Sequence, residues 1–432
     1  MKIVFLIMIF LQGVLVSQEI SKISVSGVEV PIVFEKDTSL PIASLQLVVK
    51  NAGSMEDGAH EGIAKFLSSI LGEGTREINS SAFAEELEFR AISLGAHAGV
   101  ETLVFEVSSL KEQFPYALEM LKKVVKSPNF SKESFDKVKL MTLGMLSNKE
   151  SDFDYIANLN LQKLIFADTP FAHAYSGDVK SMKALKLKEV EAFYKDHMSL
   201  ENVIIVAGGD VELEDLKKAL LPILSEIKKG KVKEIPYYDA QKNAKEVVIE
   251  KESEQAYIYF GAPFYMKSGD ENAYKAKVAS FILGESGFGS RLMEEIRVKR
   301  GLAYSSYSRT SIGKFHSSFT GHLQTKNENL EEAKKIVKEE IQRFVDSGVK
   351  PEELAQAKRF LLGSEPLRNE TLSQRLSRAF FEYYGGFELG HSKKQLEKIE
   401  KLSLEELNSF IKSHDEITHL SFSVVCAPRE KK

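Results

Sequence analysis

The segment GIAKFLSSILGEGT, residues 62–75, has the periodicity of an amphipathic helix. Its apolar side chains recur every three or four residues and so share one face: Ile63, Phe66, Leu67, Ile70 and Leu71. Lys65, Ser68 and Ser69 have the same spacing and fall together on the opposite face. The segment therefore predicts a helix that buries one side and gathers three polar side chains on the other.

These three polar positions match the spacing of the zinc-peptidase motif His-x-x-Glu-His, which supplies two metal ligands and a general base. With the flanking Gly-x-Ala-x-Phe-Leu and Gly-Thr, the segment resembles the motif helix of the pitrilysin/insulinase family and of its relative, mitochondrial processing peptidase. Lys65, Ser68 and Ser69 stand where that family has its His, Glu and His. The resemblance implies a scaffold that has kept its shape and lost its metal chemistry.

No other group of residues rebuilds the metal site. The resemblance places the family's third ligand, a glutamate, on a helix that here carries Met141, Gly144 and Met145. None of the nine histidines forms His-x-x-Glu-His, His-Glu-x-x-His or a His-x₃-His pair, and His60-Glu61 are adjacent and point to different sides. An ammonium group at Lys65 also opposes a bound dication. We therefore expect no metal and no cofactor in this chain.

Length and composition exclude several other classes of protein. The 432 residues are too many for one ordinary core, so two or more domains are expected. The formal net charge of −4 gives no electrostatic basis for binding nucleic acid. The one cysteine, Cys426, excludes an internal disulfide framework and a cysteine zinc cluster, and it is better explained as a buried thiol than as a nucleophile.

Residues 1–17 have the features of a cleaved signal peptide. Lys2 supplies the positive start, residues 3–16 are mostly apolar, and Ser17 is a small residue at the expected cleavage point. The apolar run is too short for an ordinary membrane span, although an uncleaved anchor is the alternative. We expect an exported protein, periplasmic or secreted, whose mature chain has no stable membrane span.

The order of predicted elements recurs in the two halves of the chain. Residues 20–227 contain a strand hairpin, the motif helix, a helix over 80–94, a strand pair and further helices before a strand at 202–210. Residues 246–432 repeat that order, and the lysine-rich stretch 228–245 is the predicted linker. The alternative is two unrelated α+β domains.

The predicted fold class is α+β, with two homologous domains that each have a mixed or mainly antiparallel sheet flanked by helices. The resemblance further implies that the two domains form half of a clamshell chamber, whose other half is a zinc-bearing chain of similar size.

A second motif lies in the second half, where Ser290-Arg291-Leu292 is followed by Ile296-Arg297-Val298-Lys299-Arg300-Gly301-Leu302-Ala303-Tyr304. In the pitrilysin/insulinase family an Arg and a Tyr seven residues apart reach across the cavity to the substrate, and the resemblance places these roles on Arg297 and Tyr304. A guanidinium and a phenol hydroxyl are donors that can hold a peptide carbonyl and a developing oxyanion. A surface arginine and a strand tyrosine are the plain structural alternative, and a shift in alignment would select Lys299 or Arg300 instead.

The loop before this motif carries Gly284, Gly287 and Gly289. It lacks the Gly-Lys-Ser/Thr ending of a phosphate-binding P-loop. It resembles, in a much shorter form, the glycine-rich substrate loop of the non-catalytic subunit of mitochondrial processing peptidase.

The leading hypothesis is a non-catalytic subunit of an exported heterodimeric zinc metallopeptidase. A homologous partner would carry the zinc and hydrolyse peptides or unfolded polypeptides, and this chain would close the chamber and supply Arg297 and Tyr304. The alternative is a non-enzymatic structural or peptide-binding paralogue of the same fold. No arrangement of residues in the sequence supports an independent hydrolase.

Overall fold

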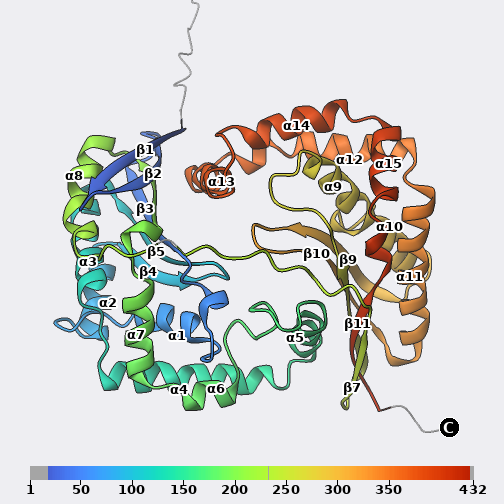
Figure 1. Ribbon diagram of the computed structural model, residues 1–432, viewed down its shortest axis with the longest axis horizontal. Helices are drawn as coiled ribbons and strands as arrows, with labels where there is room; N and C mark the ends of the chain where they lie inside the picture. The colour runs from blue at the N-terminus through green and yellow to red at the C-terminus, as the bar shows by residue number, and fades with distance from the viewer. Residues whose placement is uncertain (1–17, 232, 429–432) are drawn as a thin grey trace, which may run out of the picture.

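The computed structural model describes residues 18–231 and 233–428. Figure 1 shows two halves that face each other, each built on one β-sheet with helices packed against it. The predicted signal peptide, residues 1–17, lies outside the described residues. Among the helices described, none is long and apolar enough to cross a membrane.

The first sheet is mixed and has the strand order β1-β2-β6-β3-β5-β4. Only β2 and β6 pair in parallel, and the other neighbours are antiparallel. All seven residues of β6 are buried, as expected for a central strand covered on both faces. The strands are β1 (Gln18–Val25), β2 (Val28–Lys36), β3 (Ile42–Lys50), β4 (Ser93–Ala98), β5 (Thr102–Leu110) and β6 (Val203–Gly209).

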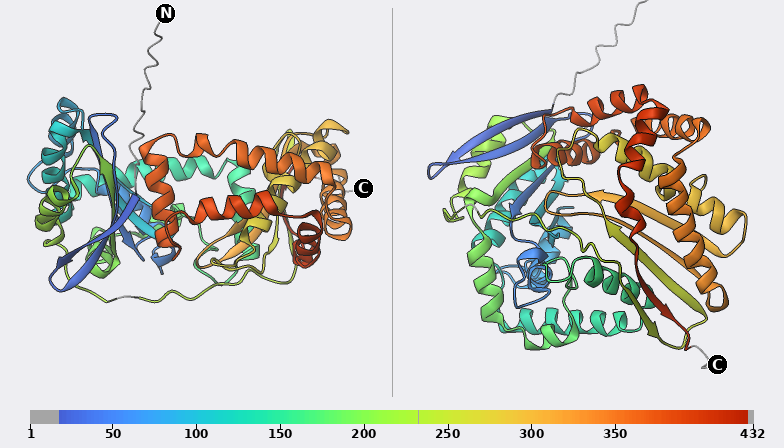
Figure 2. Two further views of the ribbon diagram at one scale, coloured as in Figure 1. Left: turned by 90° about the horizontal axis from the view of Figure 1, so that it is seen from above. Right: turned by 45° about the vertical axis from the view of Figure 1, so that its right-hand side comes forward.

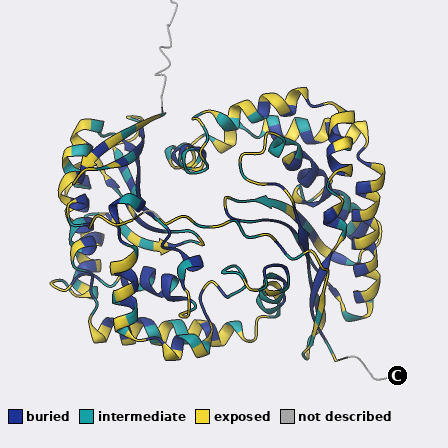
Figure 3. Cartoon of the chain, in the orientation of Figure 1, coloured by how far each residue is buried: buried dark blue, intermediate teal, exposed yellow. Residues whose placement is uncertain are grey.

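The helices of the first half, whose buried residues Figure 3 shows, bury their apolar faces in one core together with this sheet, some on the strands and some on other helices. They are α1 (Ile63–Ile70), α2 (Ser80–Phe89), α3 (Phe114–Lys126), α4 (Lys132–Lys149), α6 (Val179–Ala184), α7 (Leu187–His197) and α8 (Leu213–Leu224). The predicted helix over 80–94 was too long. It ends at Phe89 because Ala91 has a left-handed backbone, with φ 51°, and Ser93 already begins β4.

The second sheet repeats the topology of the first. Its order is β7-β11-β8-β10-β9, with β7 and β11 parallel and the other pairs antiparallel. Removing β1 from the first sheet leaves the same succession of strands and directions, which supports an internal duplication. The strands are β7 (Glu246–Glu250), β8 (Gln255–Pro263), β9 (Ala303–Ile312), β10 (Ser317–Lys326) and β11 (Ser421–Cys426).

The helices of the second half pack against that sheet in the same manner. They are α9 (Ala273–Ser280), α10 (Arg291–Met293), α11 (Leu330–Ser347), α12 (Pro351–Gly363), α14 (His391–Lys401) and α15 (Leu404–Lys412). Two π-helical segments, Phe281–Glu285 and Glu294–Val298, continue α9 and α10. The predicted α+β class, with two domains of mixed sheets and flanking helices, is confirmed.

Each half gives one helix to the sheet of the other half (Figure 1). Helix α5 (Phe153–Ile165) packs on β8 and β11, and α13 (Leu372–Tyr384) packs on β2 and β6. Leu376 and Ala379 of α13 are buried with valines and an isoleucine of the first sheet. Figure 2 shows the described residues of the linker, 228–231 and 233–245, running along one side of the molecule between the halves. The halves are therefore joined by packed helices as well as by the linker.

An ion-pair group reinforces the contact made by α13. Arg375 donates from Nε to Glu35 Oε1 and from Nη2 to Asp37 Oδ2, each at 2.6 Å. The Glu35 side chain is fully buried, so its charge depends on this partner and on Gln18, which donates to it at 2.9 Å.

Candidate functional site

Helix α1 carries the altered motif on a well-packed scaffold. Phe66 and Leu67 are fully buried, and the Phe66 ring lies 5.2 Å from the Phe135 ring of α4. The Ser68 and Ser69 hydroxyls both donate to the backbone carbonyl of Lys65, at 2.8 and 3.2 Å. The two hydroxyls are therefore used within the helix, and Ser68 is itself buried.

A buried aspartate, Asp57, fixes the start of α1. Asp57 was not predicted from the sequence. Asp57 accepts backbone N–H groups of Gly62 at 2.7 Å and Ala64 at 3.0 Å, which suits a carboxylate at a helix N-terminus. His173 Nε2 lies 3.2 Å from Asp57 Oδ2. Burial raises the pKa of Asp57. Burial alone would lower the pKa of His173, but the hydrogen bond and charge of Asp57, the charge of Glu61 and the Ser54 carbonyl together outweigh it and raise that pKa. The acidic residue shortly before a predicted helix was the available signal.

The residues at the motif do not fit a zinc ion. Across residues 18–231 and 233–428, no group of three or more His, Cys, Asp or Glu side chains could hold a metal. On α4, where the family's third ligand is expected, Met141 is 64% and Met145 38% exposed. His60 lies beside Glu189 at 3.8 Å instead of facing the motif, and His173 is bonded to Asp57. Thioether, ammonium and hydroxyl groups are a poor set for Zn²⁺.

We expect the purified chain to bind no stoichiometric zinc. The triple variant Lys65→His, Ser68→Glu, Ser69→His should also fail to become an efficient peptidase, because the third ligand and the groups that would orient the new histidines are missing. Metal analysis and a peptide-hydrolysis assay on both proteins test this. About one tightly held zinc in the wild-type chain, or robust zinc-dependent cleavage by the triple variant, would contradict the account.

The second motif forms an exposed aromatic–cation stack. Arg297 lies in the π-helix Glu294–Val298, and its guanidinium carbon is 4.3 Å from the centre of the Tyr304 ring and 4.5 Å from that of Phe288. Tyr304 is 81% and Phe288 66% exposed. Within the described parts of the chain, neither Arg297 nor Tyr304 donates a side-chain hydrogen bond. The aromatic rings therefore orient the guanidinium while both donors stay open to a ligand.

The glycine loop supplies the second ring of this stack. Gly287 and Gly289 have left-handed backbones, with φ 66° and 90°, and they flank Phe288. Gly284 has a packing role, because a Cβ there would lie 2.1 Å from Ser308 Oγ. The structure therefore joins the predicted loop to the predicted pair through Phe288, which was not singled out from sequence. In the sequence, an aromatic residue between two glycines was the signal that could have identified Phe288.

The neighbouring cations are engaged elsewhere. Lys299 donates to Glu295 Oε1 and Arg300 to Glu295 Oε2, each at 2.7 Å. Arg291 is held by Glu353 at 2.6 Å and by the Gly348 carbonyl at 2.7 Å. Among the arginines of residues 291–300, Arg297 alone keeps a guanidinium without a hydrogen-bond partner among the described residues. This favours Arg297 over the shifted alternatives.

Glu295 ties the π-helix to the body of the domain. Burial raises the pKa of Glu295, but hydrogen bonds from Lys299, Arg300 and Arg343 outweigh it and lower that pKa to about 2. Arg297 lies in the same π-helix as Glu295, so the ion pairs of Glu295 help to position the stack. Turns of π-helix are frequent at functional sites.

Glu295→Gln should lower the thermal midpoint at pH 7 by a few degrees, because the charge that holds three cations is lost. The folded-state pKa lies below the ordinary value of 4.5, so this stabilisation is present above that value and is lost as the pH falls toward 2. Thermal unfolding of both proteins between pH 2 and 7 tests this. A difference that does not shrink with acid would show that Glu295 acts by packing.

Comparison with known proteins places this fold in a family. The family model "Insulinase (Peptidase family M16)" matches residues 31–178, and "Peptidase M16 inactive domain" matches residues 184–361. The chain belongs to peptidase family M16. The first match contains the altered motif on α1, and the second contains the Arg297–Tyr304 stack.

Individual relatives of this M16 chain agree with that assignment. "Non-peptidase homolog YmxG" of Helicobacter pylori is 40% identical over 408 residues, which is 94% of each chain. "Uncharacterized zinc protease YmxG" of Bacillus subtilis is 23% identical over 351 residues, 81% of this chain and 84% of that one. A peptidase M16 inactive domain from Pseudomonas fluorescens superposes with TM-score 0.88 at 25% identity, covering 96% of this chain and 99% of that chain.

The match to the inactive-domain model and the similarity to a non-peptidase homolog agree with the residues on α1. This chain is a non-catalytic M16 member without a zinc site of its own. The resemblance on which the sequence analysis relied is confirmed, and the roles of Arg297, Tyr304 and the glycine loop stay predictions.

Proposed function

We propose that this protein is the non-catalytic subunit of an exported heterodimeric zinc metallopeptidase. It pairs with a homologous chain that carries His-x-x-Glu-His and zinc, closes the chamber around a peptide or unfolded polypeptide, and presents Arg297 and Tyr304 to that substrate. Export rests on the predicted signal peptide, and the mature protein would be periplasmic or secreted.

The observation that carries this proposal is the contrast between the two motifs. On α1 the polar residues are bonded to the helix backbone and form no ligand set. At Arg297 a guanidinium is held between two exposed rings and has no hydrogen-bond partner among the described residues. Exposed donors in fixed positions suit a peptide carbonyl that becomes more negative during hydrolysis. This contrast supports a chain that binds no metal itself and contributes groups to substrate binding.

A longer protein of similar fold offers a parallel for the proposed pairing. The structure of the periplasmic protease PqqL from Escherichia coli superposes with TM-score 0.77 at 12% identity, covering 95% of this chain but 47% of that one. This likeness concerns the fold alone. A fold of this kind therefore occurs as about half of a longer chain, and the two subunits that we propose would together form an assembly of similar size.

The alternative function is a structural or peptide-binding paralogue with no part in hydrolysis. A purely structural protein gains nothing from an 81% exposed tyrosine stacked on an arginine that has no hydrogen-bond partner among the described residues. That observation favours the subunit of a peptidase.

Tyr304→Phe separates the two functions. The variant keeps the ring that stacks on Arg297 and removes only the hydroxyl donor, so hydrolysis by the assembled complex should fall about tenfold. Tyr265→Phe, at a tyrosine that is 49% exposed, is the matched control and should leave the rate unchanged. A Tyr304→Phe complex that assembles and cleaves at the wild-type rate would favour the structural paralogue.

A further inference from the structure

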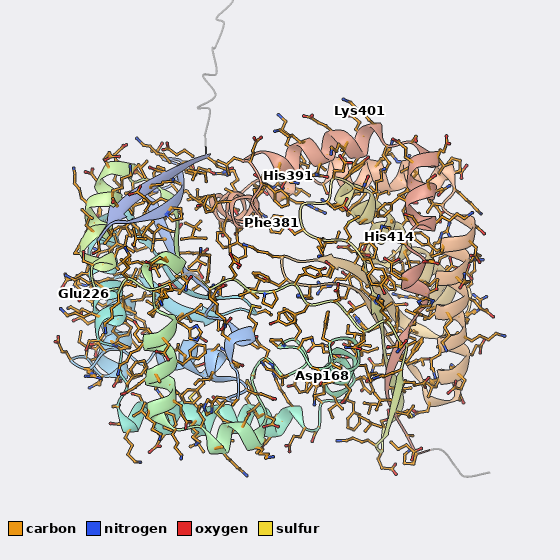
Figure 4. The ribbon with its side chains drawn as sticks, in the orientation of Figure 1. Asp168, Glu226, Phe381, His391, Lys401 and His414 are labelled. Carbon is orange, nitrogen blue, oxygen red and sulfur yellow. The ribbon has the colours of Figure 1, made fainter. Side chains whose placement is uncertain are left out.

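A cavity of about 310 Å³ lies in the second half, away from both motifs. Its walls come from α9, α13, α14 and the short 3-10 helix Pro366–Arg368. Figure 4 labels Phe381 on α13 and His391 at the start of α14, two of the residues that line it. The opposite face of α13 is buried on the first sheet, so this wall of the cavity is held in place by the other half of the molecule.

Part of the cavity lining is apolar. Phe381 is 61% exposed although it lies beside a pocket, and the Phe387 ring stacks on His391 at 4.1 Å with an interplanar angle of 15°. Tyr274 and Ile312 complete this wall. Covering such rings with an apolar group removes them from water, which is favourable in proportion to the area buried.

The lining also carries an excess of positive charge. Lys277, Arg368 and Arg378 line the cavity together with one carboxylate, that of Glu365. Arg378 is paired with Glu365. Lys277 and Arg368 donate no side-chain hydrogen bond to any described residue. Burial lowers the pKa of Lys277, and repulsion from the nearby Arg368 cation lowers it further. This is expected where two cations lie close together with only one carboxylate shared between them and Arg378.

The lining also contains an acceptor that no described residue uses. The Gln395 side-chain oxygen, Oε1, is buried without a hydrogen-bond partner, while its nitrogen lies 3.1 Å from His391 Nε2. A buried amide oxygen without a partner costs free energy that a ligand N–H would recover. The cavity thus offers two free cations, one free acceptor and an aromatic wall.

We propose that this cavity binds the C-terminal end of a peptide whose last residue is apolar. The terminal carboxylate would meet Lys277 and Arg368, the last backbone N–H would reach Gln395, and the side chain would cover Phe381. A peptide N-terminus is disfavoured because its ammonium group would face two unpaired cations. The inference rests on the residues of this cavity and does not depend on Arg297 and Tyr304.

The test uses a fluorescein-labelled hexapeptide that ends in phenylalanine, with the purified full chain and fluorescence anisotropy. Amidation of the terminal carboxylate should weaken binding about tenfold or more, because charge-assisted hydrogen bonds are lost. Arg368→Gln and Phe381→Ala should each weaken binding of the free-acid peptide to a similar degree. Both side chains are exposed, so neither variant should lose its fold, and thermal unfolding checks this.

Lys393→Gln is the matched control, since Lys393 is an exposed cation of α14 outside the cavity, and it should bind the peptide as the wild type does. Equal binding of the amidated and free-acid peptides would overturn the proposal, as would failure of the free-acid peptide to bind. Displacement of the peptide by an equal concentration of 3-phenylpropionate would also overturn it, because the cavity would then recognise small carboxylic acids and not peptide ends. Peptide binding to this cavity is measured without hydrolysis, so the hydrolytic activity of Arg297 variants neither supports nor contradicts the proposal.

Discussion

Arg297→Ala is expected to reduce peptide hydrolysis by the assembled heterodimer by about 10²–10³-fold, the usual cost of removing a donor to a developing oxyanion. The guanidinium lies between Phe288 and Tyr304 and has no hydrogen-bond partner among the described residues. Truncation therefore removes substrate contacts without breaking an internal ion pair. The assay is cleavage of a fluorogenic peptide at a concentration of complex fixed by size-exclusion chromatography.

Arg359→Ala is the control for this variant, because Arg359 is an exposed arginine of α12 in the same half of the chain. It should assemble and cleave as the wild type does. If Arg297→Ala also cleaves at the wild-type rate within an intact complex, Arg297 has no role in the reaction. If it fails to assemble, the residue belongs to the subunit interface and the proposed division of labour is wrong.

Arg375→Ala should destabilise the folded chain by about 3 kcal/mol, because it leaves the fully buried Glu35 carboxylate without its main charge partner. The effect should appear as a lower urea midpoint, with the slope unchanged. Arg375 joins α13 to the first sheet, so the loss should be accompanied by loosening of α13 in hydrogen exchange.

A second substitution identifies the cause of this loss. Adding Glu35→Gln to Arg375→Ala removes the unpaired charge and should restore much of the stability. Arg359→Ala again serves as the exposed control and should change stability by less than about 0.5 kcal/mol. A double variant no more stable than Arg375→Ala would show that the arginine acts through packing instead of charge.

The sequence was sufficient to predict the helices and strands whose periodicity is strong. The α1 segment and the long helix α11 follow directly from the spacing of apolar residues. The end of α2 was misplaced because a left-handed Ala91 cannot be recognised from composition. The exchange of α5 and α13 between the halves was also missed, since periodicity shows that a helix has an apolar face but not which sheet covers that face.

The residues of the candidate site were likewise predicted only in part from the sequence. Arg297 and Tyr304 were found because a known family carries an Arg and a Tyr at this spacing. Phe288 and Asp57 were missed because their roles come from contacts made only after folding: a ring placed over Arg297 and a carboxylate placed at the start of α1. The pairing of Lys299 and Arg300 with Glu295 likewise required the structure, since sequence spacing alone left three cations as candidates.

The most direct test of the proposed function is to mix the purified chain with a His-x-x-Glu-His chain from the same genome whose sequence also predicts a signal peptide. Size and peptide hydrolysis should be measured on the same samples. We expect a 1:1 complex that cleaves peptides far faster than the zinc-bearing chain alone, with no cleavage by this chain alone. Two chains that remain separate, or a zinc-bearing chain that is equally active without this one, would contradict its role as a peptidase subunit.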